Sequence, residues 1–390
     1  MPDYPRTILH RSKTDALKRF HPWVFSGAIK KEVSEPLQDG DLTDVYSDTG
    51  EYLATGFYST GSIAVKVLTF APIADLKQVF TDKISRAYHL RQKINLVGNN
   101  QTNCYRLINA EGDGMPGLII DWYAGTAVIQ TYSWGMHRQR HLIGQILQQI
   151  YGVDLQVIYD KSGVILPVES QFLLGEQSSG LVLENNHQFS VDWVGGQKTG
   201  FFLDQRESRA LLASYVANQK VLNTFCYSGG FSVYALAAGA ELVDSVDSSA
   251  KAIAWTTQNL GLNFPTANQR AIVADVFDFL KESPAYTYDV IVLDPPAFAK
   301  NLSSRHQAVM AYRRLNELAL NKIKPGGVLF TFSCSQVVSP EQFQGGVLAG
   351  AIATGRGIQI LHHLYQPADH PVSLYHPEGL YLKGLVLEVH

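Results

Sequence analysis

Cys334 and Asp294 are the residues of this 390-residue chain whose types and positions best suit covalent chemistry. Each follows an apolar run of the kind that forms a buried strand in a parallel sheet, so both side chains should meet at the carboxyl edge of that sheet. Two prolines, Pro295 and Pro296, come directly after Asp294. Their rings fix φ and remove amide donors, which predicts a rigid loop beside a ligand. A thiol and a carboxylate would therefore face one pocket.

A second set of residues suits a nucleoside. The run at 221–225 leads into a turn, Cys226-Tyr227-Ser228-Gly229-Gly230, whose glycines allow the backbone to approach a ligand. Asp247 ends the next predicted strand and could bind both hydroxyls of a ribose, whereas Asp275 follows the third and could accept from an adenine amino group. The spacing is not GxGxxG, which disfavours a pyrophosphate turn and hence NAD or FAD.

Each of these features alone is weak, since an aspartate at a strand end is more often a helix cap or a turn former. Their order on successive strands is the stronger signal, because it describes a site for adenosine without phosphates. S-adenosylmethionine is such a ligand, and here the sequence resembles the class I methyltransferases. The residues that we expect to contact this methyl donor are Phe225, Tyr227, Gly229, Gly230, Asp247 and Asp275.

A thiol beside a methyl donor suits methylation at an unreactive ring carbon. Carbon 5 of cytosine becomes nucleophilic only after a thiolate adds to carbon 6. Cys334 would supply that thiolate, and Asp294 could hydrogen-bond the ring nitrogen and the exocyclic amine. The other two cysteines, Cys104 and Cys226, are interpreted as small buried side chains, which is the commoner role of a lone cysteine.

The elements that must position these residues fall into three predicted domains. Residues 1–72 read as a small β-rich domain and residues 73–190 as an α+β domain. From 191 to 390 the pattern predicts a doubly wound α/β domain, in which parallel strands alternate with helices of roughly 10 to 20 residues. Its five predicted strands cover 221–225, 242–246, 271–273, 290–293 and 328–332.

Composition excludes several broad classes. Hydrophobic residues make up 46% of the chain and charged residues 17%, which is typical of an ordered globular protein. We find no secretory signal and no uninterrupted apolar span, so no membrane partner is expected. Three widely spaced cysteines form neither a disulfide framework nor a CxxC zinc pattern, so we expect no metal and a reducing cytoplasm.

Charge is distributed unevenly along the chain. The first 31 residues hold seven Lys or Arg and two Asp, a net of +5, whereas the other 359 hold 25 basic and 33 acidic residues, a net of -8. A basic end on an acidic body would allow phosphate contacts there, although a solvated lysine-rich surface is an equally good interpretation of the charge alone.

Taken together, the chain resembles the bacterial 23S rRNA cytosine-5 methyltransferases that carry an N-terminal PUA domain, over essentially its whole length. The motifs that carry this resemblance are HPWVFSGAI at 21–29, EGDGMPGL at 111–118, QKTGFFLDQR at 197–206, NTFCYSGGF at 223–231, DPP at 294–296, FSCS at 332–335, ADHP at 368–371 and PEGLYLKG at 377–384.

The resemblance implies a role for several further residues. It makes Cys334 the residue that forms the covalent adduct, and Ala297 stands where many related RNA enzymes keep a second cysteine that assists product release. It places Asp204 and Arg206 near the amino-acid end of the donor. A capping aspartate with a surface ion pair is an equally good interpretation of these two residues.

The resemblance also implies the partners. PUA domains bind structured RNA, which makes Arg11, Lys13 and Arg19 candidate phosphate contacts. The target cytosine must leave its stack, so Pro295 and Pro296 would contact RNA, and the substrate would be naked or partly assembled ribosomal RNA of the large subunit. A second copy of the chain, in a homodimer, is the other partner that we consider.

Three other functions remain to be discriminated. A DPP loop also serves enzymes that methylate exocyclic base nitrogens, where Cys334 would be structural. A ribosome-assembly factor could bind RNA and donor without catalysis. A NAD-dependent reductase is disfavoured by the absent GxGxxG turn.

Overall fold

The computed structural model describes residues 4–30 and 36–390, and these group into two compact units. The first unit contains residues 1–183, 191–203 and 368–379, and the second contains 184–190, 204–367 and 380–390. Among the described residues, no helix combines the length and apolar character that crossing a bilayer requires.

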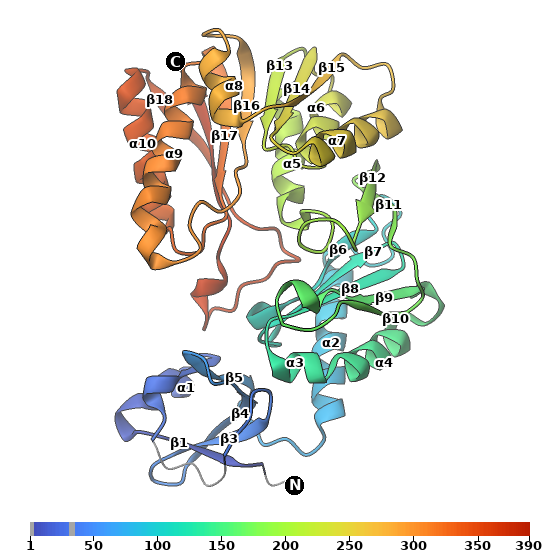
Figure 1. Cartoon of the computed structure of the whole chain (residues 1–390), viewed down its shortest axis with the longest axis vertical. Helices are drawn as coiled ribbons and strands as arrows, with labels where there is room; N and C mark the ends of the chain where they lie inside the picture. Colours follow the sequence, from blue (N-terminus) through green and yellow to red (C-terminus); the bar gives the residue numbers. More distant parts are fainter. Residues whose placement is uncertain (1–3, 31–35) are drawn as a thin grey trace. The chain divides into compact units, whose positions relative to one another are not determined.

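The first unit holds two five-stranded sheets (Figure 1). The N-terminal sheet has the strand order β1-β3-β4-β5-β2 and includes two short strands, β1 and β2, that the sequence pattern did not predict. Its core is continuous with that of the middle sheet, because Phe57 and Leu68 pack in the same cluster as Phe80 and Ile120. The N-terminal elements are β1 (Arg6–Leu9), η1 (Arg11–Lys13), α1 (Asp15–Lys18), β2 (Trp23–Phe25), η2 (Ser26–Ala28), β3 (Leu42–Ser47), β4 (Tyr52–Tyr58) and β5 (Ile63–Thr69).

The middle sheet has the order β10-β9-β8-β7-β6 and is covered by α2 and α4, whose apolar faces supply much of its core. Its elements are α2 (Leu76–Lys93), β6 (Cys104–Asn109), η3 (Ala110–Asp113), β7 (Leu118–Tyr123), β8 (Thr126–Thr131), α3 (Trp134–Arg138), α4 (Arg140–Tyr151), η4 (Gly152–Asp154), β9 (Val157–Asp160), η5 (Ser162–Val164) and β10 (Gln171–Leu174). A two-stranded sheet of β11 (Ser179–Glu184) and β12 (His187–Asp192) follows along the chain. The prediction of a β-rich part followed by an α+β part is therefore confirmed in architecture.

The second unit is a seven-stranded sheet with the order β15-β14-β13-β16-β17-β19-β18. All neighbours from β15 to β17 are parallel, which confirms the doubly wound α/β prediction. The sequence pattern did not predict the last two strands, of which β19 inserts antiparallel between β17 and β18. Its strands are β13 (Lys220–Thr224), β14 (Leu242–Asp247), β15 (Gln269–Val273), β16 (Tyr288–Leu293), β17 (Ile323–Ser333), β18 (Ile358–Leu364) and β19 (Lys383–Val389).

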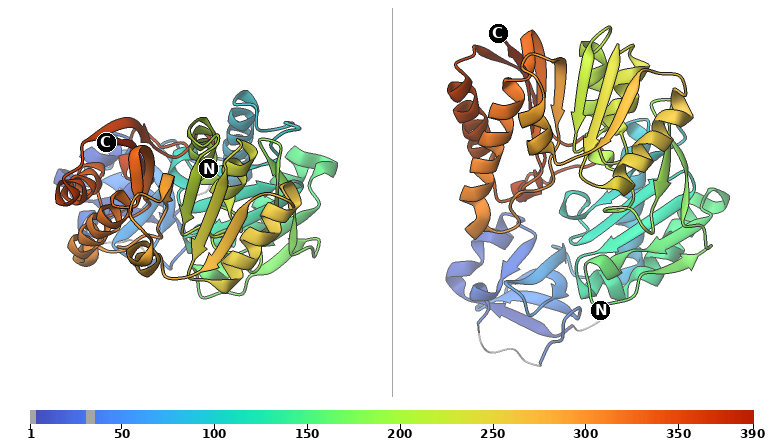
Figure 2. Two further views of the ribbon diagram at one scale, coloured as in Figure 1. Left: turned by 90° about the horizontal axis from the view of Figure 1, so that it is seen from above. Right: turned by 45° about the horizontal axis from the view of Figure 1, so that its top comes forward.

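Helices cover both faces of this sheet, because its strands carry apolar side chains at successive positions. Leu222 and Ile291 face the cluster formed with α8, α9 and α10, whereas their neighbours Val221 and Val290 face the cluster formed with α5 and α6. Figure 2 shows α9 and α10 running side by side. The helices are η6 (Leu203–Gln205), α5 (Arg206–Leu212), η7 (Ala213–Tyr215), α6 (Gly230–Ala237), α7 (Ala250–Asn263), α8 (Val276–Glu282), η8 (Leu302–Ser304), α9 (Arg305–Leu320), α10 (Pro340–Thr354) and η9 (Pro377–Gly379).

Candidate functional site

The carboxyl ends of three adjacent strands place the predicted site residues at one edge of the seven-stranded sheet. Thr224 at the end of β13 is in register with Leu293 at the end of β16, and Leu293 is in register with Thr331 of β17. The strand order reverses between β13 and β16, and ligands of open α/β sheets bind at such a point. The loops that begin after these strands therefore start side by side.

The turn after β13 is tightly constrained. Phe225 and Tyr227 both have positive φ angles, 52° and 49°. Residues other than glycine adopt this backbone conformation at a cost of about 1–2 kcal/mol each. Gly229 has φ 77° and begins the helix α6 as its N-cap, and a Cβ there would lie 2.9 Å from Cγ2 of Thr256. Strained backbone of this kind clusters at ligand-binding sites.

Asp247, the last residue of β14, is held against this turn. Its Oδ2 accepts a hydrogen bond from the amide of Tyr227 at 3.0 Å, and its Oδ1 accepts one from the amide of Ser249 at 2.9 Å. A carboxylate oxygen can accept more than one hydrogen bond, so both oxygens retain capacity for a pair of hydroxyl groups. The side chain is half-buried, so it is within reach of a ligand at the sheet edge.

Asp275 has a defined structural role, because it is the N-cap of α8. Its Oδ1 accepts hydrogen bonds from the amides of Phe277 at 2.9 Å and Asp278 at 3.1 Å. The amide of the preceding residue, Ala274, donates to the carbonyl oxygen of Asp247 at 3.0 Å. The cap is therefore adjacent to the Asp247 loop, and a contact between Asp275 and adenine stays a prediction.

We expect Asp275→Ala to lower the free energy of unfolding by about 1 kcal/mol, the usual effect of losing an N-cap. Asp275→Asn should be nearly neutral, because asparagine caps equally well. Urea unfolding of both variants measures this effect. Titration of the two variants with the methyl donor separates the capping role from a role in donor binding. Equal loss of donor affinity in both variants supports a contact between Asp275 and the donor. Wild-type donor affinity in Asp275→Asn shows that donor binding does not need the negative charge of Asp275.

The predicted nucleophile and the predicted rigid loop lie together. Cys334 is the first residue after β17 and is partly exposed, and its Sγ lies 3.9 Å from the carbonyl oxygen of Pro295. Pro295 is buried and Pro296 is exposed, so the loop presents one proline to solvent. Asp294 accepts a hydrogen bond at Oδ1 from Nε2 of Gln205 at 3.0 Å, which fixes the carboxylate.

Both serines beside Cys334 are anchored away from it. Oγ of Ser333 donates to the hydroxyl of Tyr312 at 2.8 Å, and that hydroxyl lies 3.1 Å from Oγ of Ser335. Burial raises the pKa of Tyr312, so its phenol keeps its proton and the network stays intact at ordinary pH. These buried contacts hold the backbone on both sides of the thiol.

Lys383 is a residue that the sequence analysis missed. It starts β19 in register with Ser333, and its buried Nζ donates to the carbonyl oxygens of Ser335 at 2.6 Å and Tyr381 at 3.0 Å. Burial lowers the pKa of Lys383 to about 8, while charge interaction with Cys334 acts in the opposite direction. A lysine just before the apolar run Leu385-Val386-Leu387 was the available signal in the sequence.

Asp204 and Arg206 are buried, which corrects one interpretation of them. Oδ2 of Asp204 accepts a hydrogen bond from the hydroxyl of Tyr381 at 2.7 Å, and Nε of Arg206 lies 3.5 Å from Oε2 of Glu184. Gln205, not Asp204, occupies the N-cap position of α5. The pair is therefore not a capping aspartate with a surface ion pair, and its placement near the donor stays a prediction.

The predicted phosphate contacts lie on the N-terminal sheet of the first unit. Arg11 and Lys13 form the exposed turn η1, and Arg19 follows α1 and is also exposed. Within residues 4–30 and 36–390 the structure records no ion pair for these three, whereas their neighbour Lys18 pairs with Glu51 at 2.8 Å. These three charges are therefore presented to solvent.

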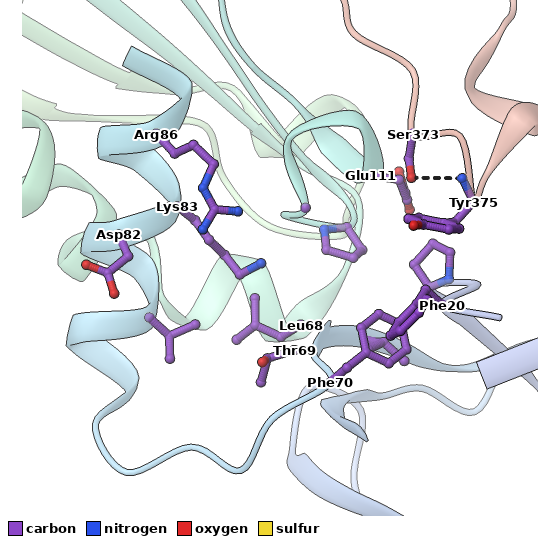
Figure 3. A pocket seen from close by; sticks show the side chains of 15 residues that line it. Phe20, Leu68, Thr69, Phe70, Asp82, Lys83, Arg86, Glu111, Ser373 and Tyr375 are labelled. Atoms are coloured by element: carbon purple, nitrogen blue, oxygen red, sulfur yellow. Dashed lines mark hydrogen bonds between the residues drawn. The ribbon is translucent and has the colours of Figure 1, made fainter. Parts of the chain in front are cut away.

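A cavity of about 530 Å³ lies in the same unit (Figure 3). Phe20 and Tyr375 line it with rings that are 49% and 53% exposed, and their centroids are 5.4 Å apart. Lys83 and Arg86 of α2 line its other side, and burial together with Arg86 lowers the pKa of Lys83 to about 8. The sequence analysis missed this set, because its members come from three separated segments.

Two family descriptions match the chain. Residues 8–70 match a PUA-like domain, and residues 161–371 match an S-adenosylmethionine-dependent methyltransferase. The second match includes the turn after β13, Asp247, the DPP loop and Cys334.

Relatives and solved structures agree with these descriptions over the full chain. A protein of Aeromonas hydrophila named ribosomal RNA large subunit methyltransferase I is 40% identical over 394 residues, covering 97% of this chain and 98% of its own length. A Salmonella arizonae protein of the same name is 38% identical over 401 residues, covering 100% and 98%. A crystal structure of a candidate methyltransferase complexed with SAH has a TM-score of 0.86 at 25% identity, covering 98% of this chain and 99% of that one.

Proposed function

The chain belongs to the S-adenosylmethionine-dependent methyltransferase family represented by ribosomal RNA large subunit methyltransferase I, and from that premise we propose that it forms 5-methylcytosine in 23S ribosomal RNA. The observation that carries the cytosine-5 assignment is the position of Cys334, a partly exposed thiol 3.9 Å from the DPP loop that holds Asp294. A nitrogen methyltransferase has no use for a thiol at that point, since an exocyclic amine attacks a methyl donor directly.

The residues at the sheet edge fit S-adenosylmethionine. The Asp247 carboxylate has capacity for the ribose hydroxyls, the strained turn from Phe225 to Gly230 would let the backbone approach the ligand, and Asp275 would contact the adenine. Asp204 and Arg206 would face the amino-acid end. When bound, the donor supplies an electrophilic methyl group on a sulfonium.

The proposed chemistry begins at Cys334. Its thiolate forms a bond to carbon 6 of the flipped cytosine, and the electron pair of the 5,6 double bond makes carbon 5 nucleophilic. Asp294, oriented by Gln205, hydrogen-bonds the ring nitrogen and amine as charge builds on the ring. After methylation a base removes the proton from carbon 5, the double bond re-forms, and the thiolate leaves. Ala297 cannot assist that release as a second cysteine would.

Lys383 stabilises the thiolate in this scheme. Its ammonium donates to the carbonyl oxygens of Tyr381 and of Ser335, the residue after Cys334, and a nearby cation favours the charged form of a thiol. The lysine is therefore a positioning and electrostatic group with no bond to substrate.

We expect Lys383→Met to move the acid limb of the pH–rate profile to higher pH by about one unit, which lowers the rate there by about tenfold. Single-turnover methylation from pH 6 to 9 measures this. The pH dependence of stability is a second readout. The native state holds Lys383 with its pKa lowered to about 8 from 10.5, so between these pH values the unfolded state binds more protons than the native state. The contribution of Lys383 to the free energy of unfolding therefore increases as the pH rises through this range. An unshifted profile would contradict the role in the reaction.

The first unit is proposed to hold the RNA. Arg11, Lys13 and Arg19 would contact phosphates, which position an RNA without reading its sequence. In the adjacent cavity, the rings of Phe20 and Tyr375 could stack with an unpaired base while Lys83 contacts phosphate. Exposed Pro296 would border the flipped base at the catalytic end. A ribosomal RNA substrate implies that the enzyme acts in the cytoplasm, on naked or partly assembled large subunits. A homodimer is a second assembly to be tested.

Mass mapping of ribosomal RNA from cells with and without the protein tests the proposal. Loss of one 5-methylcytosine from 23S RNA, restored by the wild-type gene, is the expected result. Loss of a methyl group from a base nitrogen would instead identify the enzyme as a nitrogen methyltransferase. An unchanged map would favour a non-catalytic assembly factor.

A further inference from the structure

The segment 368–379 of the first unit is firmly attached at its beginning. Oδ2 of Asp369 accepts a hydrogen bond from the amide of Arg106 at 3.0 Å, and the carbonyl oxygen of Asp369 accepts one from Arg91 at 2.7 Å. Asn109 donates to the carbonyl oxygen of Pro371 at 2.9 Å. These contacts attach the beginning of the segment to α2 and to the edge strand β6.

The other end of the segment has an unsatisfied polar group. His376 is only 3% exposed, and its ring packs against Trp23 of β2 with centroids 4.3 Å apart. Within the described residues its Nε2 has no hydrogen-bond partner. A buried polar atom without a partner destabilises the folded state, so its persistence calls for an explanation.

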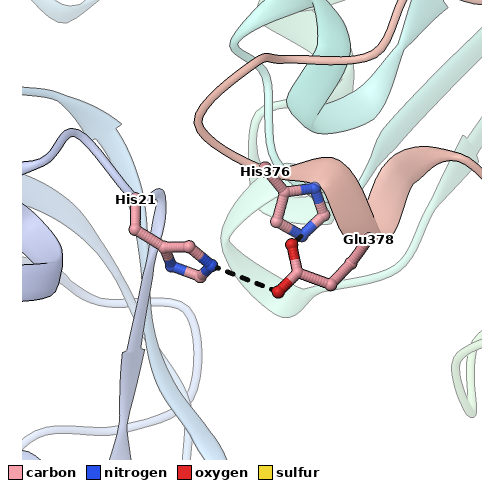
Figure 4. Close-up of side chains that lie close together, drawn as sticks. All are labelled: His21, His376 and Glu378. Atoms are coloured by element: carbon pink, nitrogen blue, oxygen red, sulfur yellow. Dashed lines mark ion pairs between the residues drawn. The ribbon is translucent and has the colours of Figure 1, made fainter.

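Two further metal-ligating groups converge on this nitrogen (Figure 4). Oε2 of Glu378 lies 3.8 Å from Nε2 of His376, and Oε1 lies 3.7 Å from Nε2 of His21. One ligating atom from each of the three residues lies within 4.8 Å of the others. All three side chains therefore surround one point.

The spacing is too wide for direct hydrogen bonds and close to that of ligands around an ion. Zinc–nitrogen bonds of about 2.0–2.1 Å place neighbouring tetrahedral ligands roughly 3.3 Å apart, so the two distances from Glu378 to the histidines exceed that value by about half an ångström. Nδ1 of His21 accepts a hydrogen bond from the amide of Trp23 at 3.2 Å and lies 3.4 Å from the carbonyl oxygen of Trp23, so the ring is held beside β2.

We propose that His21, His376 and Glu378 bind one divalent transition-metal ion, with zinc the best match for two imidazoles and a carboxylate. The ion would fasten the end of segment 368–379 to the N-terminal sheet and would leave one coordination position for water. The site is independent of the methyl-transfer chemistry, so it stands whether or not the proposed function does.

The test uses the full-length protein, stripped with a chelator and then given zinc chloride. After gel filtration, elemental analysis should find about one zinc per chain, and the melting temperature should rise by a few degrees, as expected for a ligand that binds only the folded state. His21→Gln and Glu378→Gln should each lose the zinc and the thermal shift. Glu378 is 54% exposed, so its substitution leaves the fold intact.

Two control variants exclude other zinc ligands. His10→Gln changes an exposed histidine that follows β1 of the same sheet, and Cys334→Ser removes the partly exposed thiol. Both should keep one zinc per chain. The proposal would be overturned if the wild type held less than a tenth of an equivalent of zinc per chain. It would also be overturned if Glu378→Gln and His21→Gln held as much zinc as the wild type. A wild type that gains stability equally with magnesium would also overturn it, because these ligands do not suit that ion.

Discussion

Cys334→Ser should abolish methyl transfer while the protein still binds its donor. We expect the single-turnover rate to fall by roughly 10⁴-fold, the scale on which removal of an active-site nucleophile acts. The reason is chemical, because without addition at carbon 6 the cytosine ring has no nucleophilic carbon. Donor affinity should change less than about threefold, since Cys334 belongs to the loop after β17 and the donor residues follow β13 and β14.

Transfer of labelled methyl groups to RNA measures the rate, and calorimetry measures donor binding. Cys104→Ser is the matched control, because it changes a buried thiol whose Sγ contacts the carbonyl oxygen of Leu183 at 3.4 Å, a contact that serine can keep. RNA containing 5-fluorocytosine should trap a covalent complex with the wild type and none with Cys334→Ser. Wild-type turnover in the serine variant would sink the cytosine-5 mechanism and leave a nitrogen methyltransferase.

Asp247→Ala should weaken donor binding by about 100-fold or more. Two hydrogen bonds from ribose hydroxyls to a carboxylate contribute about 1.5–3 kcal/mol each, and both are lost. The same substitution removes the acceptors of the Tyr227 and Ser249 amides, so the strained turn after β13 also loses its support. Methylation at saturating RNA should therefore require a much higher donor concentration.

Calorimetric titration with S-adenosylmethionine and with S-adenosylhomocysteine checks this expectation. Asp278→Asn is the control, since that exposed carboxylate at the start of α8 pairs only with Lys281 among the described residues. A thermal melt confirms that the alanine variant is folded before affinity is compared. An unchanged dissociation constant in folded Asp247→Ala would remove Asp247 from the donor site.

Much of the catalytic edge was predictable from the sequence for a physical reason. Apolar runs that end in glycine, aspartate or cysteine identify buried parallel strands, and the carboxyl ends of parallel strands share one edge. Cys334 and Asp294 follow such runs directly, and the structure brings the loop of one to the thiol of the other. Local order along the chain was enough, because each residue follows its own strand by one position.

Tertiary structure alone decided which residues from distant parts of the chain lie beside the residues singled out in the sequence. Lys383 reaches the carbonyl oxygen of Ser335, the residue after Cys334, because β19 inserts antiparallel beside β17, a pairing that no local pattern specifies. Asp204 and Arg206 are buried by Tyr381 and Glu184, which lie far away in sequence. His21 and His376 converge although 354 positions separate them. Periodicity in the sequence indicates which face of a helix or strand is apolar. Which residues pack against that face depends on how the elements pack together. The charge interactions of residues such as Lys383 depend on those partners.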